Sequence, residues 1–135
     1  MKILKAKKLA RLENFEDLEI WQLARELSRI VKSMTTKGLS VKDFRFCSQI
    51  NSAAGSVMDN IAEGFERDGN KEFINFLYIA KGSNGEVRSQ SYRALDWGYI
   101  TELEQEEVLK LTEKIKYKTQ GLIKVLKNSG GKGYK

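Results

Sequence analysis

Few side chains in this sequence could do acid–base or metal chemistry. Glu63 and Glu86 lie in two helix-like segments and could act as paired acids or as metal ligands. The sequence contains no histidine, which removes histidine acid–base catalysis, Ser-His-Asp triads and histidine metal ligands. The Glu-x-x-His motif of di-iron bundles is therefore missing as well. We expect a protein that is not an enzyme, with no catalytic residues, no metal site and no cofactor.

The stretch Gly82–Gly85 does not have the features of a phosphate-binding loop, because it lacks the Lys-Ser/Thr ending and a preceding strand. Polar residues instead lie in or beside the apolar stripes of two helix-like segments: Asn60, Glu63, Ser83 and Glu86. Polar groups near a core require hydrogen-bond partners. We predict that these four form a structural polar network, with Glu63 and Glu86 at least partly buried.

The basic residues indicate a polyanion as a binding partner. The formal net charge is +6, and residues 1–13 hold five basic side chains against Glu13. Residues 101–108 hold four glutamates, and residues 109–135 hold eight lysines against Glu113. A lysine-rich solvated surface would give the same count without any partner, but two basic segments favour nucleic acid, RNA or DNA. The candidate binding residues are Lys2, Lys5, Lys7, Lys8, Arg11, Lys110, Lys114, Lys118, Lys124 and Lys127.

Aromatic side chains add a second candidate contact with nucleic acid, because bases stack on aromatic rings. The candidates are Trp21, Tyr78, Tyr92, Trp97 and Tyr99. At helical spacing such residues more often belong to a core or an interface, and we favour that interpretation. The single cysteine, Cys47, lies on the apolar face of its segment and is interpreted as a small buried hydrophobe.

Apolar periodicity predicts four helices, over about 17–36, 43–65, 71–95 and 101–126. Asp68, Gly69 and Asn70 supply a turn and an N-cap candidate, and Thr101-x-x-Glu104 predicts a capping box. Gly82 and Gly85 would ordinarily indicate a turn, but the apolar stripe continues in phase through residues 82–85. We therefore predict one continuous third helix, in which the glycines allow a neighbouring helix to approach closely.

The expected fold class is all-α, an up-down-up-down four-helix bundle. It divides into a basic N-terminal arm (1–14), the bundle (15–127) and a flexible tail (128–135). No apolar run is long enough to span a membrane, no signal peptide is present, and one cysteine cannot form an internal disulfide. We expect a cytoplasmic protein.

Several short motifs resemble the signature of one bacterial family of four-helix bundles. They are Phe15-x-x-Leu18-x-x-Trp21-x-x-Ala24, Gln49, Ser56, Asn60-Ile61-Ala62-Glu63-Gly64, Glu72-Phe73, Phe76-Leu77, Ala80, Gly82-Ser83, Glu86 and Leu95-x-x-Gly98-Tyr99-Ile100. The family includes proteins encoded in intervening sequences of large-subunit ribosomal RNA genes, and the accessory variability determinant of diversity-generating retroelements. The resemblance covers about residues 15–126.

The resemblance implies a homo-oligomer, a pentamer in characterised relatives, with a basic surface that binds RNA or DNA. In the retroelement branch it also implies a reverse transcriptase as partner. Relatives often carry Arg-Arg after the glutamine of the second helix, whereas this chain has Asn51-Ser52, so the basic ends would have to carry the binding. An up-down-up-down bundle brings both basic segments to one end. The alternative function is a protein-interaction scaffold, in which the small residues around Ser52, Gly55 and Ser56 pack subunits or a partner.

Overall fold

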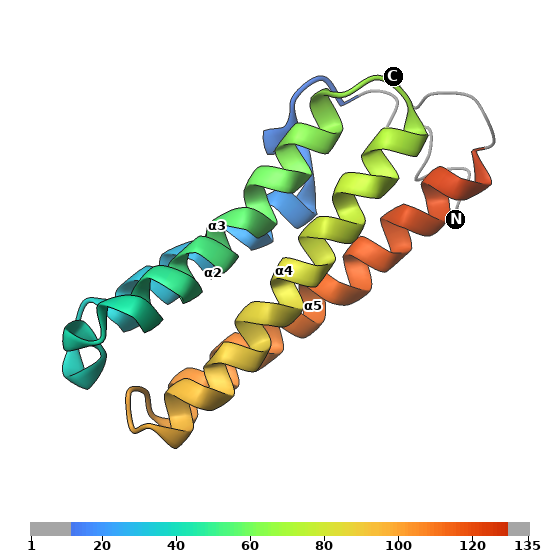
Figure 1. Cartoon of the computed structure of the whole chain (residues 1–135). Coiled ribbons are helices and arrows are strands. Elements are labelled where there is room, and N and C mark those ends of the chain that lie inside the picture. Colours follow the sequence, from blue (N-terminus) through green and yellow to red (C-terminus); the bar gives the residue numbers. More distant parts are fainter. Residues whose placement is uncertain (1–11, 130–135) are drawn as a thin grey trace.

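The computed structural model describes residues 12–129, which form helices and connecting turns, with no strand in that range (Figure 1). Four long helices make up almost all of it: α2 (Glu19–Thr35), α3 (Phe44–Glu66), α4 (Asn70–Asp96) and α5 (Glu102–Asn128). Two short 3-10 helices, η1 (Phe15–Asp17) and η2 (Gly38–Lys42), precede α2 and α3. The all-α four-helix fold predicted from the sequence is confirmed.

Successive helices run antiparallel. α2 packs against α3 and α5, and α4 packs against α3 and α5. The start of α2, the turn from α3 to α4 and the end of α5 share one end of the bundle, which we call the terminal end (Figure 1). η2 and the connection from α4 to α5 lie at the other end, the loop end (Figure 1). At about 1.5 Å per residue, α4 and α5 are each roughly 40 Å long.

The core consists of the apolar stripes that the periodicity predicts. Leu27, Ile50, Val57, Leu77 and Ile115 are fully buried. Burial of such side chains supplies most of the favourable free energy of folding. The outer members of the predicted stripes are less enclosed: Trp21 packs edge-on against Phe15 and is partly exposed, and Cys47 is only partly buried. The Cys47 thiol donates to the Ser40 carbonyl at 3.1 Å.

The turn between α3 and α4 forms at the predicted residues, and α4 begins one residue earlier than expected. Gly69 is the N-cap of α4, with φ at +87°, a conformation that glycine adopts without strain. Asn70 is the first helical residue, and its buried side-chain nitrogen donates to the Leu126 carbonyl at 3.1 Å. Asn70 therefore ties the start of α4 to the end of α5.

α4 continues unbroken through Gly82–Gly85, as predicted, but these glycines are not points of close approach between helices of the subunit. A Cβ atom added at Gly82 or Gly85 would meet nothing within 4 Å, so neither allows a close approach inside the subunit. The close contact lies at Gly64, where an added Cβ would be 2.6 Å from the Phe76 Cβ. The position that requires glycine is therefore in the α3 motif Asn60–Gly64.

Side-chain hydrogen bonds fasten the loop end. Asp43 caps α3 by accepting from the Phe46 backbone N–H at 3.0 Å, and it also accepts from the Tyr99 hydroxyl at 2.5 Å. The predicted capping box is present, because Thr101 and Glu104 each bond the other's backbone N–H. The Tyr99 hydroxyl lowers the pKa of Asp43, with smaller contributions from the Phe46 N–H and Arg93, and the same bond raises the pKa of Tyr99.

These shifts predict a pH-dependent stability. A carboxyl whose folded pKa is depressed stabilises the fold above its unfolded pKa, and this contribution is lost as the pH falls from about 4 through the folded value. The bond that raises the pKa of Tyr99 contributes stability that is fully present below the unfolded pKa of about 10. This contribution is lost as the pH rises through the folded pKa. We expect Asp43→Asn to make the acid loss of thermal stability shallower in melting curves taken from pH 2 to 8. Asp68→Asn, at an exposed site in the turn between α3 and α4, is the control and should leave the acid limb unchanged.

Candidate functional site

Three of the small and polar residues singled out in the sequence meet where α3 packs against α4. The hydroxyls of Ser56 and Ser83 lie 2.8 Å apart and form one hydrogen bond. The Asn60 side chain donates to the Ser56 carbonyl at 2.8 Å and to the Ser56 hydroxyl at 2.9 Å. This polar contact replaces apolar packing at the interface and aligns the two helices.

The two glutamates do not belong to this contact, and the expectation that they are partly buried is wrong. Glu63 is exposed and pairs with Arg67 one turn later on the same helix, at 2.7 Å. Glu86 is exposed and accepts from the side chain of Gln90 at 3.4 Å. Because both side chains are exposed, solvent screens their charges and neither requires a buried partner.

This geometry predicts that Ser56 and Ser83 contribute more to the free energy of unfolding than Glu63 and Glu86 do. Ser56→Ala removes a partner from both Ser83 and Asn60, and we expect it to lower the free energy of unfolding by about 1 kcal/mol. Glu86→Ala should change it by less than about 0.5 kcal/mol, as is typical for exposed sites. Urea denaturation of both variants measures the difference. Equal effects would show that the Ser56–Ser83 contact contributes nothing specific.

Ser56 and Ser83 also line a polar hollow of about 490 Å³ between α3 and α4. Its walls carry Ser52 and Gln49 from α3, and Glu86, Gln90 and Arg93 from α4. Gln90 is buried, and its side-chain oxygen has no hydrogen-bond partner within residues 12–129. The small side chains leave room for an element of another molecule to approach.

The five candidate lysines of α5 have different neighbours. Lys110 pairs with Glu106 at 3.3 Å, and Lys118 pairs with Glu19 of α2 at 3.0 Å. Lys127 lies on the α4 side, where it donates to the Tyr78 hydroxyl at 2.8 Å. Lys114 and Lys124 are exposed and make no ion pair within the described residues. The five lysines therefore do not form one uniform anion-binding surface.

The basic residues of the arm, from Lys2 to Arg11, lie outside the described residues. Leu12, the first described residue, lines a hollow together with Leu122 and Val125 of α5. The described part of the chain therefore begins beside the last turns of α5, at the terminal end. Lys124 and Lys127 project from those same turns.

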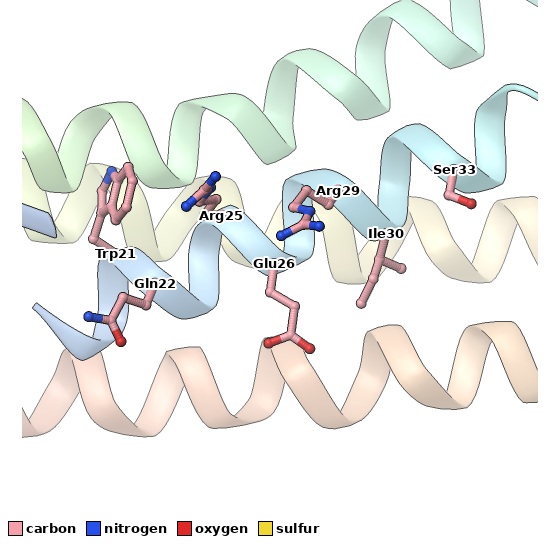
Figure 2. Close-up of a pocket in the computed structure, with 7 residues that line it drawn as sticks. All are labelled: Trp21, Gln22, Arg25, Glu26, Arg29, Ile30 and Ser33. Atoms are coloured by element: carbon pink, nitrogen blue, oxygen red, sulfur yellow. The ribbon is translucent and has the colours of Figure 1, made fainter.

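α2 carries a cationic surface that was missed in the analysis of the sequence. A shallow hollow of about 560 Å³ runs along its outer side, lined by α2 residues alone (Figure 2). In Figure 2, Trp21, Arg25 and Arg29 lie along one side of the helix, whereas Glu26 points toward α5. The Arg25 guanidinium is 6.0 Å from the Trp21 ring centroid, and neither arginine makes an ion pair within residues 12–129. The i, i+4, i+8 spacing of these three residues was the signal in the sequence.

The described part of the chain offers no candidate metal site and no candidate membrane-spanning helix. No group of three or more metal-ligating side chains is found within residues 12–129. None of the described helices combines the length and the apolar character that crossing a bilayer requires.

Comparisons with known proteins place this architecture. A family model described as 23S rRNA-intervening sequence protein matches residues 16–121. Among solved structures, a protein of unknown function from the S23 ribosomal protein family of Bacteroides thetaiotaomicron is similar, with a TM-score of 0.71 and 24% identity. The match covers 78% of this chain and 95% of that one, and at this identity it shows the fold alone. No curated protein matches the chain.

Proposed function

The chain belongs to the 23S rRNA-intervening sequence protein family, and on that premise we propose that it is a non-enzymatic, nucleic-acid-binding helical bundle that works as a homo-oligomer. The observation that carries the proposal is the separation of charge along the bundle. α5 begins with Glu102, Glu104, Glu106 and Glu107 at the loop end and reaches the terminal end with Lys124 and Lys127. Residues 1–11, which lie outside the described range, add five basic side chains to the sequence, and Leu12, the residue that follows them, lies against Leu122 and Val125 in the last turns of α5.

Such an arrangement favours nucleic acid over a small anion. Cations that are spread over an arm and the end of a helix match a polymer of phosphates, which releases condensed counterions when lysine and arginine replace them. The glutamates at the loop end would repel the same polymer and so orient it on the terminal end. Lys114 and the arginines of α2 are further exposed cations on the bundle.

The resemblance extends the proposal to a cytoplasmic pentamer and to a reverse transcriptase as a partner. In a closed ring every subunit points the same way along the axis, so the terminal ends of all subunits share one rim. The polar hollow between α3 and α4, with the unsatisfied oxygen of Gln90, supports a subunit contact at that face. A polyanion would neutralise the crowded positive charge on the rim.

The proposal is tested by titrating the full-length protein with a labelled generic RNA at several salt concentrations. Several phosphate contacts predict a steep linear fall of log Kobs with log salt concentration. Sedimentation velocity on the same sample tests for an oligomer. The absence of binding at low salt, or a strictly monomeric protein, would overturn the corresponding half of the proposal.

The second candidate function is a protein-interaction scaffold without a nucleic-acid role. It is favoured by apolar side chains at the loop end, where Phe44 is 80% exposed and Leu39 is 69% exposed. Leu103, near the start of α5, is also exposed. Exposed apolar residues that cluster at one end of a molecule are typical of protein contacts. Under this alternative the RNA titration gives no binding at any salt concentration.

A further inference from the structure

One face of α4 carries an alternation of aromatic and cationic residues that the proposed function does not yet use. Tyr78, Lys81, Gly85, Arg88 and Tyr92 follow one another at intervals of three or four residues. This spacing keeps all five on one side of the helix, and we call them the tyrosine row. Contacts from α5 define that side, because Lys127 bonds Tyr78, and Arg88 bonds the Leu109 carbonyl.

The two tyrosines present their rings to solvent. Tyr78 is 47% exposed and Tyr92 is 48% exposed. The Lys127 ammonium lies 2.8 Å from the Tyr78 hydroxyl but 5.3 Å from the ring centroid, so it lies toward the hydroxyl end of the ring. The side chain of Tyr92 makes no hydrogen bond and no ring contact within residues 12–129. Both rings can therefore receive a flat partner on a face.

Two cations of the tyrosine row, Lys81 and Arg88, are available to bind an anion. Arg88 donates to the Leu109 carbonyl at 2.8 Å and to the Thr112 hydroxyl at 3.1 Å, both through one terminal nitrogen. Its remaining N–H donors make no hydrogen bond within the described residues. Neither Lys81 nor Arg88 makes an ion pair there. A guanidinium that is fixed in this way loses little conformational freedom when it binds a phosphate.

Gly85 leaves the centre of the row open. A Cβ atom added there would meet nothing within 4 Å, so the position serves no packing inside the subunit. Its missing side chain lets a ligand come close to the helix backbone between Lys81 and Arg88. Tyr78 and Tyr92 are fourteen residues apart, which is about 21 Å along the helix. That distance equals roughly six nucleotides at the 3.4 Å rise of a fully stacked strand, and fewer for an extended one.

We propose that the tyrosine row binds single-stranded nucleic acid, with bases stacked on Tyr78 and Tyr92 and phosphates held by Lys81, Arg88 and Lys127. This rests on the proposed nucleic-acid binding and names the form of nucleic acid and the face that takes it. Unpaired bases expose their flat faces to aromatic side chains, whereas duplex bases are already stacked on one another. The row therefore discriminates in favour of single strands.

The test is fluorescence anisotropy of the full-length protein with a labelled 20-nucleotide oligouridine and, separately, a 20-base-pair RNA duplex. We expect Tyr78→Ala and Tyr92→Ala each to weaken single-strand binding roughly 5- to 150-fold, the range for loss of one stacked base. Duplex binding should change less than about twofold. Tyr78→Phe and Tyr92→Phe keep the ring and should restore most of the single-strand affinity. The slope of log Kobs against log salt concentration should stay the same, because no phosphate contact is removed.

Tyr117→Ala is the matched control. Tyr117 is 61% exposed on α5 but lines the hollow beside Leu12 and Lys118, away from the row, so its loss should leave the preference for single strand over duplex unchanged. Equal effects of Tyr78→Ala, Tyr92→Ala and Tyr117→Ala would overturn the inference while leaving the proposed function intact. Equal losses for single strand and duplex, or a changed oligomeric state in the row variants alone, would also overturn it. Wild-type protein that binds neither RNA would instead refute the proposed function itself.

Discussion

We expect Gly64→Ala to lower the free energy of unfolding by about 1–3 kcal/mol, as overpacking does in a filled helix interface. The added Cβ would be 2.6 Å from the Phe76 Cβ and 3.0 Å from a ring carbon of Phe73. Both neighbours belong to α4, and the Phe76 Cβ cannot move without its backbone. In melting experiments the loss corresponds to roughly 4–12 °C. Gly64→Val should cost more, because a branched side chain adds two further carbons at the same contact.

Gly55→Ala is the control for this prediction. Gly55 lies on the same helix, and a Cβ added there would meet nothing within 4 Å. Alanine is favoured over glycine in a helix by up to about 1 kcal/mol, so this variant should be more stable than the wild type. If both substitutions changed the melting temperature in the same direction and by the same amount, helix propensity rather than the α3–α4 contact would govern Gly64.

We expect a variant with glutamine in place of Lys5, Lys7, Lys8 and Arg11 to lose nucleic-acid affinity broadly, whatever the sequence of the ligand. If all four contact phosphates, the slope of log Kobs against log salt should flatten by about 2.8 for a single strand and 3.6 for a duplex. Relative to 1 M salt, this corresponds at 0.1 M salt to a loss of roughly 600- to 4,000-fold in affinity. Anisotropy titrations at four or more salt concentrations measure both quantities.

The described lysines provide the comparison for the arm. Lys110 and Lys118 already pair with Glu106 and Glu19, so changing both to glutamine should flatten the slope less than changing Lys124 and Lys127. Melting curves should stay unchanged in all of these variants, which separates binding from folding. An arm variant with wild-type affinity and slope would show that the arm does not contact the nucleic acid.

Local features of the chain were predicted well from the sequence. The capping box at Thr101 and Glu104 needs only residues that are three positions apart, and it forms as expected. Likewise, α4 continues through Gly82–Gly85, because the apolar stripe keeps its phase on either side of the glycines. The fold class follows from four such stripes of similar length.

The candidate sites were predicted less well, because they depend on which helix lies beside each flank. Glu63 and Glu86 stand at the edge of their stripes, where a small rotation of the helix decides between burial and solvent, and both are exposed. Lys118 and Lys127 belong to one helix, yet they contact Glu19 of α2 and Tyr78 of α4 respectively.

The sequence alone therefore determined where each helix begins and ends, which side of it is apolar, and that basic charge gathers toward both termini. These properties depend on hydrogen bonds and side-chain spacing within a few residues. Only the tertiary structure decided that Gly64, and not Gly82 or Gly85, is the point of closest approach. It alone brought Ser56 to Ser83 and left Tyr78 and Tyr92 in solvent. The reason is that contacts between helices depend on the rotation and axial offset of whole elements, which no local pattern encodes.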